Sequence, residues 1–366
     1  MKQKDLAYVN LALVPAIGRA RLEILLATFE SAEEVLRASQ AELEKVPNIS
    51  RAAATAIASA DPHAAEKVCG RAERVGATVL LPTDSRFPQK LREIPDAPTI
   101  LFVLGNLEYL NADSVGIVGS RSHTRYGAAA CRLLSAAAAE AGLVVVSGMA
   151  RGLDRLAHEA ALEQGGGTVG VLGNGVGVVY PAANRALYER VAVEGCLLTE
   201  YPPGDKPHAG SFPRRNRLIS GLSRVTVVVE ARERSGALIT AECALNQGRE
   251  VLAVPGPITS PLSLGCNRLI QLGAKPALGP RDILEEFGRT VCDAPAASIP
   301  SDLTEAERDL LDILGLGIEQ IDEVAARAKR DVGEALAVLT SLEIRGLVTQ
   351  EPGKVFRMAY GAVGSE

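Results

Sequence analysis

The sequence predicts an α/β protein in which a doubly wound parallel sheet lies between an all-α N-terminal domain and a C-terminal winged-helix domain. From about residue 76, short β-branched runs alternate with Ala-rich helical stretches. Two similar turns lie among helical patterns before that point, and three helical patterns and a two-stranded turn follow residue 303. The 366 residues, 47% of them hydrophobic, provide enough apolar material for two or three cores.

The N-terminal domain, expected over residues 1–75, contains an internal repeat. Val-Pro-Ala-Ile-Gly at 14–18 and Val-Pro-Asn-Ile-Ser at 46–50 each precede a helical pattern, and their prolines are 32 residues apart. This pattern is typical of a helix-hairpin-helix pair, whose turns direct backbone N–H groups at a DNA phosphate. Ser50 stands where the second turn glycine is expected. A small helical docking domain is therefore favoured over DNA-contacting hairpins, and both remain open.

The central domain, expected over residues 76–290, alternates strands and helices. Its strands are mostly continuous apolar runs, which is typical of a parallel sheet covered on both faces. Such sheets bind ligands beyond the carboxyl ends of their strands, so the polar residues there are the candidate site. The expected strands are 78–81, 99–104, 114–118, 143–147, 168–172, 196–199, 224–229 and 250–254.

The C-terminal part is expected to be a linker over 291–302 and a winged-helix domain over 303–366. Helices are expected over 303–314, 318–328 and 332–346, and a two-stranded turn over 347–358. Residues 301–366 carry seven Lys and Arg and 13 Asp and Glu, within a total formal charge of −5 for the chain. An acidic module repels phosphates, so protein interaction or dimerisation is favoured over DNA reading.

Several turns after expected strands suit an anionic ligand. Residues 119–127, Gly-Ser-Arg-Ser-His-Thr-Arg-Tyr-Gly, lead into a helix expected to start near Ala128, and such a turn can hold a phosphate at the helix N-terminus. The turn is not a dinucleotide fingerprint, because Arg121 and Thr124 stand where G-x-G-x-x-G needs glycine. Similar turns begin at Ser147, at Gly173 and at Glu230.

The densest cationic feature is Phe-Pro-Arg-Arg-Asn-Arg at 212–217, which is expected to be a loop before a helical turn. Arginine forks bind phosphate oxygens with two hydrogen bonds, so ligand contact is favoured. The alternative is a surface loop that is solvated or ion-paired with Glu194 or Glu200.

Other chemistries lack their residues. His158-Glu159 is not completed to H-E-x-x-H, and the chain contains no P-loop and no G-x-S-x-G elbow. His158 is expected to be a packed or capping side chain, not a general base. The six cysteines show neither disulfide nor zinc spacing, so most are expected to be buried apolar residues. No segment suits a membrane span or a signal peptide, and we expect a cytoplasmic protein without a cofactor.

Together these motifs resemble the bacterial DNA-processing family DprA, also called Smf. The resemblance covers roughly residues 85–280, and the outer helical and winged-helix parts also fit many members. It is carried by Gly119-Ser120-Arg121, Ser147-Gly148, Gly152-Leu153-Asp154 with His158, Tyr180-Pro181 with Asn184, the run from Phe212 to Ser223, Ser235-Gly236 through Ala241, Val254-Pro255-Gly256 and Gly265-Cys266-Asn267.

The resemblance implies a non-enzymatic function. Members bind single-stranded DNA in a basic pocket of an extended Rossmann-like domain, form homodimers through that domain, and load the RecA recombinase during natural transformation. Matched by motif, the implied DNA-binding residues are Ser120, Arg121, Ser147, Gly148, Asn174, Arg214, Arg215, Asn216, Arg217, Ser235 and Gly236. The chain departs from the family pattern at Gly177, where members commonly have an aspartate.

An enzyme acting on a nucleotide is the alternative. The sheet also resembles, in outline, nucleoside-monophosphate phosphoribohydrolases. These enzymes need a Pro-Gly-Gly-x-Gly-Thr-x-x-Glu loop, whereas here Pro255-Gly256 leads into Pro257-Ile258-Thr259. The sequence therefore favours the DNA-binding interpretation.

Overall fold

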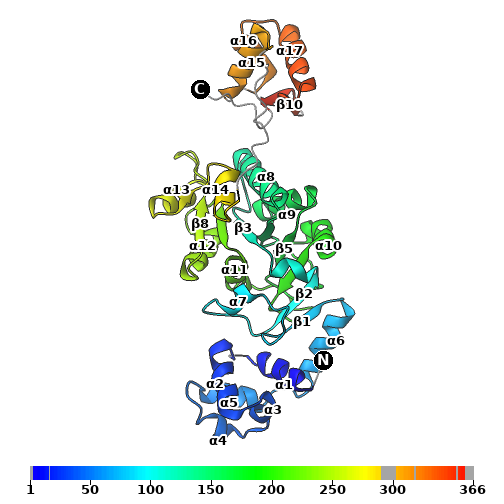
Figure 1. The fold of residues 1–366 in the computed structure, drawn as a ribbon, viewed down its shortest axis with the longest axis vertical. Coiled ribbons are helices and arrows are strands. Elements are labelled where there is room, and N and C mark those ends of the chain that lie inside the picture. The colour runs from blue at the N-terminus through cyan, green and yellow to red at the C-terminus, as the bar shows by residue number, and fades with distance from the viewer. Residues whose placement is uncertain (1–2, 16, 290–301, 317–318, 352, 359–366) are drawn as a thin grey trace. The chain divides into compact units, whose positions relative to one another are not determined.

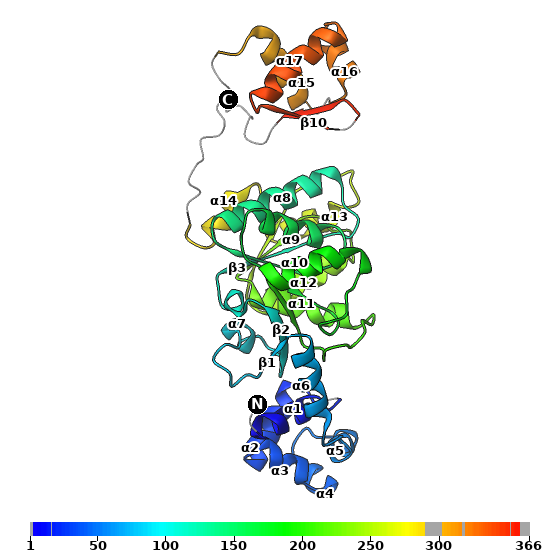
Figure 2. The ribbon, with the colours of Figure 1, turned by 90° about the vertical axis from the view of Figure 1, so that its right-hand side faces the viewer.

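The computed structural model describes residues 3–15, 17–289, 302–316, 319–351 and 353–358. The chain divides into two compact units, Met1–Thr290 and Val291–Glu366 (Figures 1 and 2). The expected N-terminal and central domains fall within the first unit. Of the expected linker at 291–302, only residue 302 lies among the described residues.

The first unit begins with six helices. They are α1 (Gln3–Ala12), α2 (Arg19–Phe29), α3 (Ala32–Arg37), α4 (Gln40–Leu43), α5 (Arg51–Ala58) and α6 (Ala64–Arg74). The two repeated turns join α1 to α2 and α4 to α5. In the second turn, the Ser50 hydroxyl accepts a hydrogen bond from Ala53 N at 3.2 Å. The chain therefore caps this helix N-terminus with its own side chain.

A nine-stranded sheet forms the centre of this unit, in the order β1-β2-β6-β5-β4-β3-β7-β8-β9. All eight expected strands are present, and the additional strand, β9, has two residues and no β-branched run to predict it. The strands are β1 (Thr78–Leu80), β2 (Leu101–Gly105), β3 (Ser114–Val118), β4 (Val144–Ser147), β5 (Thr168–Val171), β6 (Cys196–Thr199), β7 (Val225–Val228), β8 (Glu250–Ala253) and β9 (Lys275–Pro276).

The sheet is parallel except at one edge, where β1 pairs with β2 and β2 pairs with β6 in antiparallel register. A parallel pair needs a long crossover, usually a helix. The connection from β1 to β2 contains only the four-residue helix α7 (Gln89–Arg92), and β2 reaches β3 through the short 3₁₀ helix η1 (Leu107–Leu110). This edge therefore differs from the parallel remainder.

Helices cover both faces of the parallel part. The chain runs from β3 through β4 and β5 to β6 in one direction, so right-handed crossovers place α8 (Arg125–Glu140), α9 (Leu153–Glu163) and α10 (Arg185–Glu194) on one face. It then returns to β7 and moves on to β8, which places α11 (Ser211–Leu222) and α12 (Gly236–Asn246) on the other. Leu218 of α11 and Ala241 of α12 share a buried cluster with Val144 and Val146 of β4.

Three short elements complete this unit. They are the 3₁₀ helix η2 (Ala182–Asn184) before α10, helix α13 (Leu264–Gln271) between β8 and β9, and helix α14 (Pro280–Glu285). Helix α6 packs against the β2 edge of the sheet, because its Val68 and Ala72 share a buried cluster with Leu81 and with Phe102 of β2.

The direction in which the sheet is built reverses between β3 and β7. Strand β3 pairs in parallel with both β4 and β7, although β7 comes more than 100 residues later in the chain. Loops that follow neighbouring strands at such a point diverge to opposite faces and leave a crevice between them. The residues after β3, β4 and β7 border this crevice.

The second unit has the expected winged-helix fold and its own core. It contains α15 (Glu305–Gly315), α16 (Ile321–Arg327), α17 (Val332–Ile344), β10 (Val348–Glu351) and β11 (Val355–Met358). Leu310, Leu339 and Phe356 are fully buried in one cluster. Helix α17, the third helix of the fold, contains no Lys or Arg.

Candidate functional site

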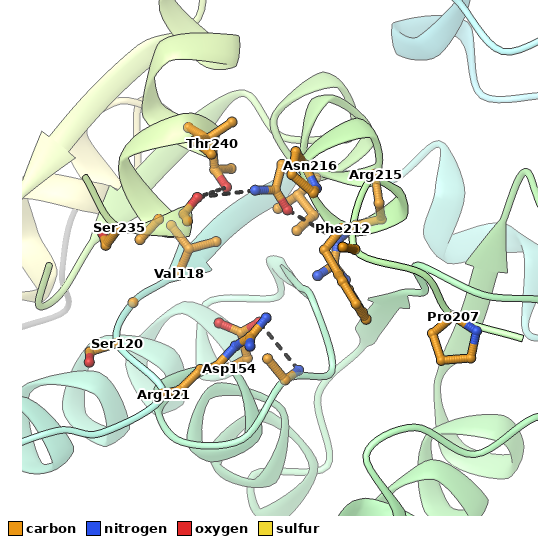
Figure 3. A pocket seen from close by; sticks show the side chains of 18 of the residues that line it. Val118, Ser120, Arg121, Asp154, Pro207, Phe212, Arg215, Asn216, Ser235 and Thr240 are labelled. Carbon is orange, nitrogen blue, oxygen red and sulfur yellow. Dashed lines mark hydrogen bonds between the residues drawn. The ribbon is translucent and has the colours of Figure 1, made fainter. Parts of the chain in front are cut away.

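A pocket of about 770 Å³ opens beyond the carboxyl end of β3, at the reversal point of the sheet. It is lined by the loops after β3, β4 and β7, by residues 207–209 and by the first turns of α11. Figure 3 shows Ser120, Arg121 and Asp154 on one side of it, with Ser235, Thr240 and Asn216 on the opposite side. Segments more than 100 residues apart in the sequence therefore meet at one site.

Arg121 is the exposed cation of the loop after β3. Its guanidinium carbon lies 5.7 Å from the centre of the Phe212 ring, which is a cation–π contact. The loop itself is well anchored: Ser122 N donates to Ser120 Oγ at 3.2 Å, and Leu153 N donates to the Ser120 carbonyl at 3.1 Å. Both predicted residues of this loop, Ser120 and Arg121, line the pocket.

The N-terminus of α8 is occupied by protein groups, in contrast to the sequence expectation of a phosphate there. The helix begins at Arg125, and the Thr124 hydroxyl accepts a hydrogen bond from Gly127 N at 3.0 Å. The buried Glu230 carboxylate accepts hydrogen bonds from Thr124 N at 3.0 Å and from Thr124 Oγ1 at 2.5 Å. A protein carboxylate thus lies where many nucleotide-binding folds hold a ligand phosphate.

The arginine cluster at 212–217 is helical and not a loop. Helix α11 begins at Ser211, and Pro213 fits its first turn because the missing N–H has no helical partner there. The helix separates neighbouring arginines onto different faces. Arg214 is exposed, whereas Arg215 and Arg217 are buried.

Arg217 is paired within the protein. Its Nη2 donates to the Glu200 carboxylate at 2.6 Å, its Nε lies 3.1 Å from Asp96 Oδ2, and both Arg217 and Glu200 side chains are 10% exposed. Neither described pocket that includes Arg121 includes Arg217. For Arg217, the structure therefore shows the alternative given above, an ion pair with Glu200.

Arg215 forms part of the pocket floor. Its guanidinium donates to the carbonyl oxygens of Gly148 and Val171, and a Cβ on Gly148 would come within 2.7 Å of Arg215 Nη1. Burial lowers the pKa of Arg215 to about 10, so the group stays charged at neutral pH. Burial raises the pKa of Asp154, and the Arg215 charge opposes that shift.

The start of α12 forms the opposite wall. Ser235 is its N-cap, and its side chain makes no capping hydrogen bond. Asn216 Nδ2 donates to the Gly236 carbonyl at 3.0 Å and thereby ties α11 to this turn. Three of the predicted site residues, Asn216, Ser235 and Gly236, line the pocket.

The remaining predicted residues lie deeper or farther away. Gly148 and Asn174 line a smaller adjoining hollow together with Arg121 and Arg215. Asn174 Nδ2 donates to the carbonyls of Gly175 and Val178, at 3.0 and 2.8 Å. The Ser147 hydroxyl donates to the Ile117 carbonyl at 2.6 Å, which joins β4 to β3, and Ser147 lines neither pocket.

Two arginines and two aromatic residues are among the lining residues that were not predicted as site residues. Arg232 lines the main pocket, Arg151 lines the smaller hollow, and Tyr180 and Phe212 line both. The two rings are 5.4 Å apart between centroids, with planes inclined by 33°. The two arginines had a signal in the sequence, since each lies in a turn that follows an expected strand. The ring pair had none, because its partners are 32 residues apart.

Other chemical features are few in the part of the chain that the structure describes. No group of three or more His, Cys, Asp and Glu is arranged to hold a metal ion among these residues. Likewise, none of the described helices is long and apolar enough to cross a membrane. Cys131, Cys196 and Cys266 are buried as expected, Cys69 and Cys243 are half-buried, and Cys292 lies outside the described residues.

The family model described as DNA recombination-mediator protein A matches residues 78–288. The chain belongs to this family. The model of the DprA winged helix domain matches residues 294–354. The membership accounts for the order of the motifs along the central sheet, and it confirms the resemblance seen in the sequence.

Individual relatives support the assignment to the DprA family. The Escherichia coli protein Smf is 42% identical over 288 residues, which cover 76% of this chain and 77% of that protein. The DNA processing protein DprA of Streptococcus pneumoniae is 46% identical over 204 residues, or 56% of this chain and 72% of that protein. The crystal structure of S. pneumoniae DprA superimposes with a TM-score of 0.68 at 35% identity, covering 78% of this chain and 99% of that one.

A second solved DprA structure concerns DNA directly. The Helicobacter pylori DNA processing protein A, described for its single-stranded DNA binding mode, superimposes with a TM-score of 0.52 at 28% identity. The match covers 58% of this chain and 95% of that one.

Proposed function

We propose that this chain binds single-stranded DNA in the pocket at the reversal point of the sheet. The observation that carries the proposal is the combination of the arginines around this pocket with the Tyr180–Phe212 ring pair in its wall. The binding mode named for the H. pylori relative supports it. Arginine supplies charge for the sugar–phosphate backbone, and an exposed ring supplies a face for a base.

The geometry suits a single strand better than a duplex. Tyr180 is 43% exposed and its ring can stack only on a base whose face is free, which a duplex does not offer. Arg121, Arg151 and Arg232 are exposed and line the main pocket or the adjoining hollow, where they can reach the phosphates of a strand. Phosphate contacts and base stacking are therefore expected to supply the affinity, with little sequence preference.

Binding without catalysis is part of the proposal. His158, the histidine of the family motif, is fully buried, and burial lowers its pKa to about 3, so it is neutral at neutral pH. Its Nδ1 lies 2.7 Å from Thr168 Oγ1, within the core. Neither this histidine nor the segment 255–259 provides the acid that a phosphoribohydrolase requires.

Arg121→Ala tests the pocket against a matched control. Removing one charge-assisted phosphate contact is expected to weaken binding of an oligothymidine about tenfold and to reduce the salt slope by about 0.7. Arg125→Ala is the control, since Arg125 is an exposed arginine four residues away that lines neither pocket. Equal effects of the two substitutions on anisotropy titrations would contradict the pocket assignment.

We also propose a homodimer formed by the first unit. Large apolar side chains are exposed within residues 258–278, which contain α13 and the edge strand β9: Ile258, Leu264, Leu272 and Leu278 are 85%, 41%, 69% and 76% exposed. Exposed apolar side chains concentrated in one segment favour an interaction surface there. Light scattering is expected to give a dimer mass for the wild type and a monomer mass for Leu272→Glu/Leu278→Glu. A dimer that survives these changes would exclude this face.

Loading of RecA onto the bound strand completes the proposal, with family membership as its support. Loading must be separated from binding. The assay is RecA filament formation on DNA that is already coated by single-strand-binding protein. The wild type is expected to shorten the lag, and a protein that binds DNA tightly without shortening the lag would contradict this step.

A further inference from the structure

A buried carboxylate lies directly behind the loop that carries Arg121. Glu230 follows β7, is 2% exposed, and accepts both hydrogen bonds from Thr124 described above. Gly127 allows this contact, because a Cβ there would come within 2.8 Å of Glu230 Cγ. Helix α8 thus begins directly against the carboxylate, whose negative charge suits the positive end of the helix.

The same loop is anchored at its other end by α9. Leu153 N donates to the Ser120 carbonyl, and Gly152 adopts a φ of +81° at a place where a Cβ would come within 2.6 Å of the Arg121 carbonyl oxygen. Arg121 therefore lies between two fixed points, Ser120 and Thr124. Ser120 is held by Leu153 of α9, and Thr124 is held by Glu230, which follows β7.

We infer that Glu230 is a positioning residue for DNA binding: it fixes the Ser120–Thr124 loop so that Arg121 is held over the Phe212 ring and at the pocket opening. The inference rests on the proposed function. It also predicts a change in DNA affinity opposite to the one expected from charge alone. Glu230 is an acid close to a site for a polyanion, so simple charge repulsion predicts that its removal strengthens DNA binding, whereas a positioning role predicts that its removal weakens binding.

The test uses Glu230→Leu, which keeps the volume but removes both acceptors, and Glu230→Gln, which keeps an acceptor for Thr124 N and a group that can bond Thr124 Oγ1. Glu230→Leu is expected to weaken oligothymidine binding three- to tenfold, the range of one or two lost hydrogen bonds. Glu230→Gln is expected to recover most of that loss. Binding by Glu230→Leu as tight as the wild type, or tighter, would overturn the inference.

A double-mutant cycle excludes a general structural effect. Because Glu230 acts through Arg121, Glu230→Leu is expected to add little to the loss caused by Arg121→Ala. Its effect is expected to add fully to that of Arg151→Ala, in the loop after β4, which lines the smaller hollow. Additivity with both arginines would show a non-specific effect and overturn the inference.

A second variant covers the case in which Glu230→Leu does not fold. Thr124→Val removes the hydroxyl from the other side of the same contact, and Thr124→Ser retains it. Valine is expected to reproduce the weakening and serine the wild-type affinity, and equal behaviour of the two would overturn the inference. Failure of the proposed function is distinct, since wild-type protein that does not bind, or an Arg121→Ala variant without effect, would remove the basis for both.

Discussion

Arg214 and Arg217 stand three residues apart on α11 and have opposite surroundings. Arg214 is exposed, while Arg217 is packed against Glu200. A sequence pattern of clustered arginines gives both the same weight as phosphate ligands. At the scale of single residues, burial separates their roles, and substitutions at the two positions are expected to differ in kind.

Arg217→Ala is expected to lower the free energy of unfolding by about 3 kcal/mol, because it leaves the Glu200 carboxylate buried without its partner. Arg214→Ala, an exposed substitution on the same helix, is the control and is expected to change that energy by less than about 0.5 kcal/mol. Urea unfolding measures both. An Arg217→Ala protein of wild-type stability that fails to bind DNA would instead make Arg217 a direct ligand.

His158 gives a pH dependence whose sign follows from burial. Its pKa is lowered from an ordinary value of 6.5 to about 3, so between these values the unfolded chain binds a proton that the folded chain does not. The free energy of unfolding is therefore expected to fall by about 1.4 kcal/mol for each pH unit below 6.5, and this contribution is fully present above 6.5. Urea unfolding of the wild type and of His158→Leu at pH 7 and 5.5 measures it. Equal pH dependence of the two proteins would contradict the assignment.

At the scale of elements, the chain shows which local features its sequence predicts. Short apolar runs such as Ser114–Val118 predict buried strands, because a strand in a parallel sheet is covered on both faces and is therefore apolar along its whole length. The interruption of 212–217 by proline and charged residues predicts a loop, yet the segment is helical. Its buried contacts, among them Arg215 with the Gly148 carbonyl, come from segments that lie far away in the sequence, so local propensity alone does not predict this helix.

Phe212, in the first turn of α11, tests the stacking contribution. Phe212→Ala is expected to weaken oligothymidine binding by about 1–3 kcal/mol while leaving the salt slope unchanged, because a ring neutralises no phosphate. Phe212→Tyr, which keeps the ring, is the control. The readout is the anisotropy titration at several salt concentrations, and a weaker affinity with a slope reduced by about 0.7, as expected for Arg121→Ala, would show that the ring acts only by orienting Arg121.

For the whole molecule, the sequence predicted where the candidate pocket lies, but it predicted only some of the residues that line it. Alternation of strands and helices predicts a parallel sheet and hence a site beyond its carboxyl ends. The strand order, which brings the turns after β3 and β7 together, depends on long-range pairing that no local pattern encodes. For the same reason the carboxylate of Glu230 at the start of α8 was not foreseen, although Glu230 begins one of the turns selected from the sequence.

The charge of the whole chain also bears on how it binds nucleic acid. The chain carries a net charge of −5, and α17 has no Lys or Arg to place in a groove. Under the proposed function, attraction for DNA comes from the arginines around one pocket, whose field is local and strongly screened by salt. The proposal therefore predicts both single-strand selectivity and salt sensitivity from the same site.

The most direct measurement is a fluorescence-anisotropy titration of a labelled oligothymidine, and of a duplex of the same length, at several salt concentrations. The account predicts preferential binding of the single strand, with the logarithm of the binding constant falling linearly with the logarithm of salt concentration, by about 0.7 for each phosphate neutralised. Equal or tighter binding of the duplex, or single-strand binding that is insensitive to salt, would contradict the assignment of DNA binding to this pocket.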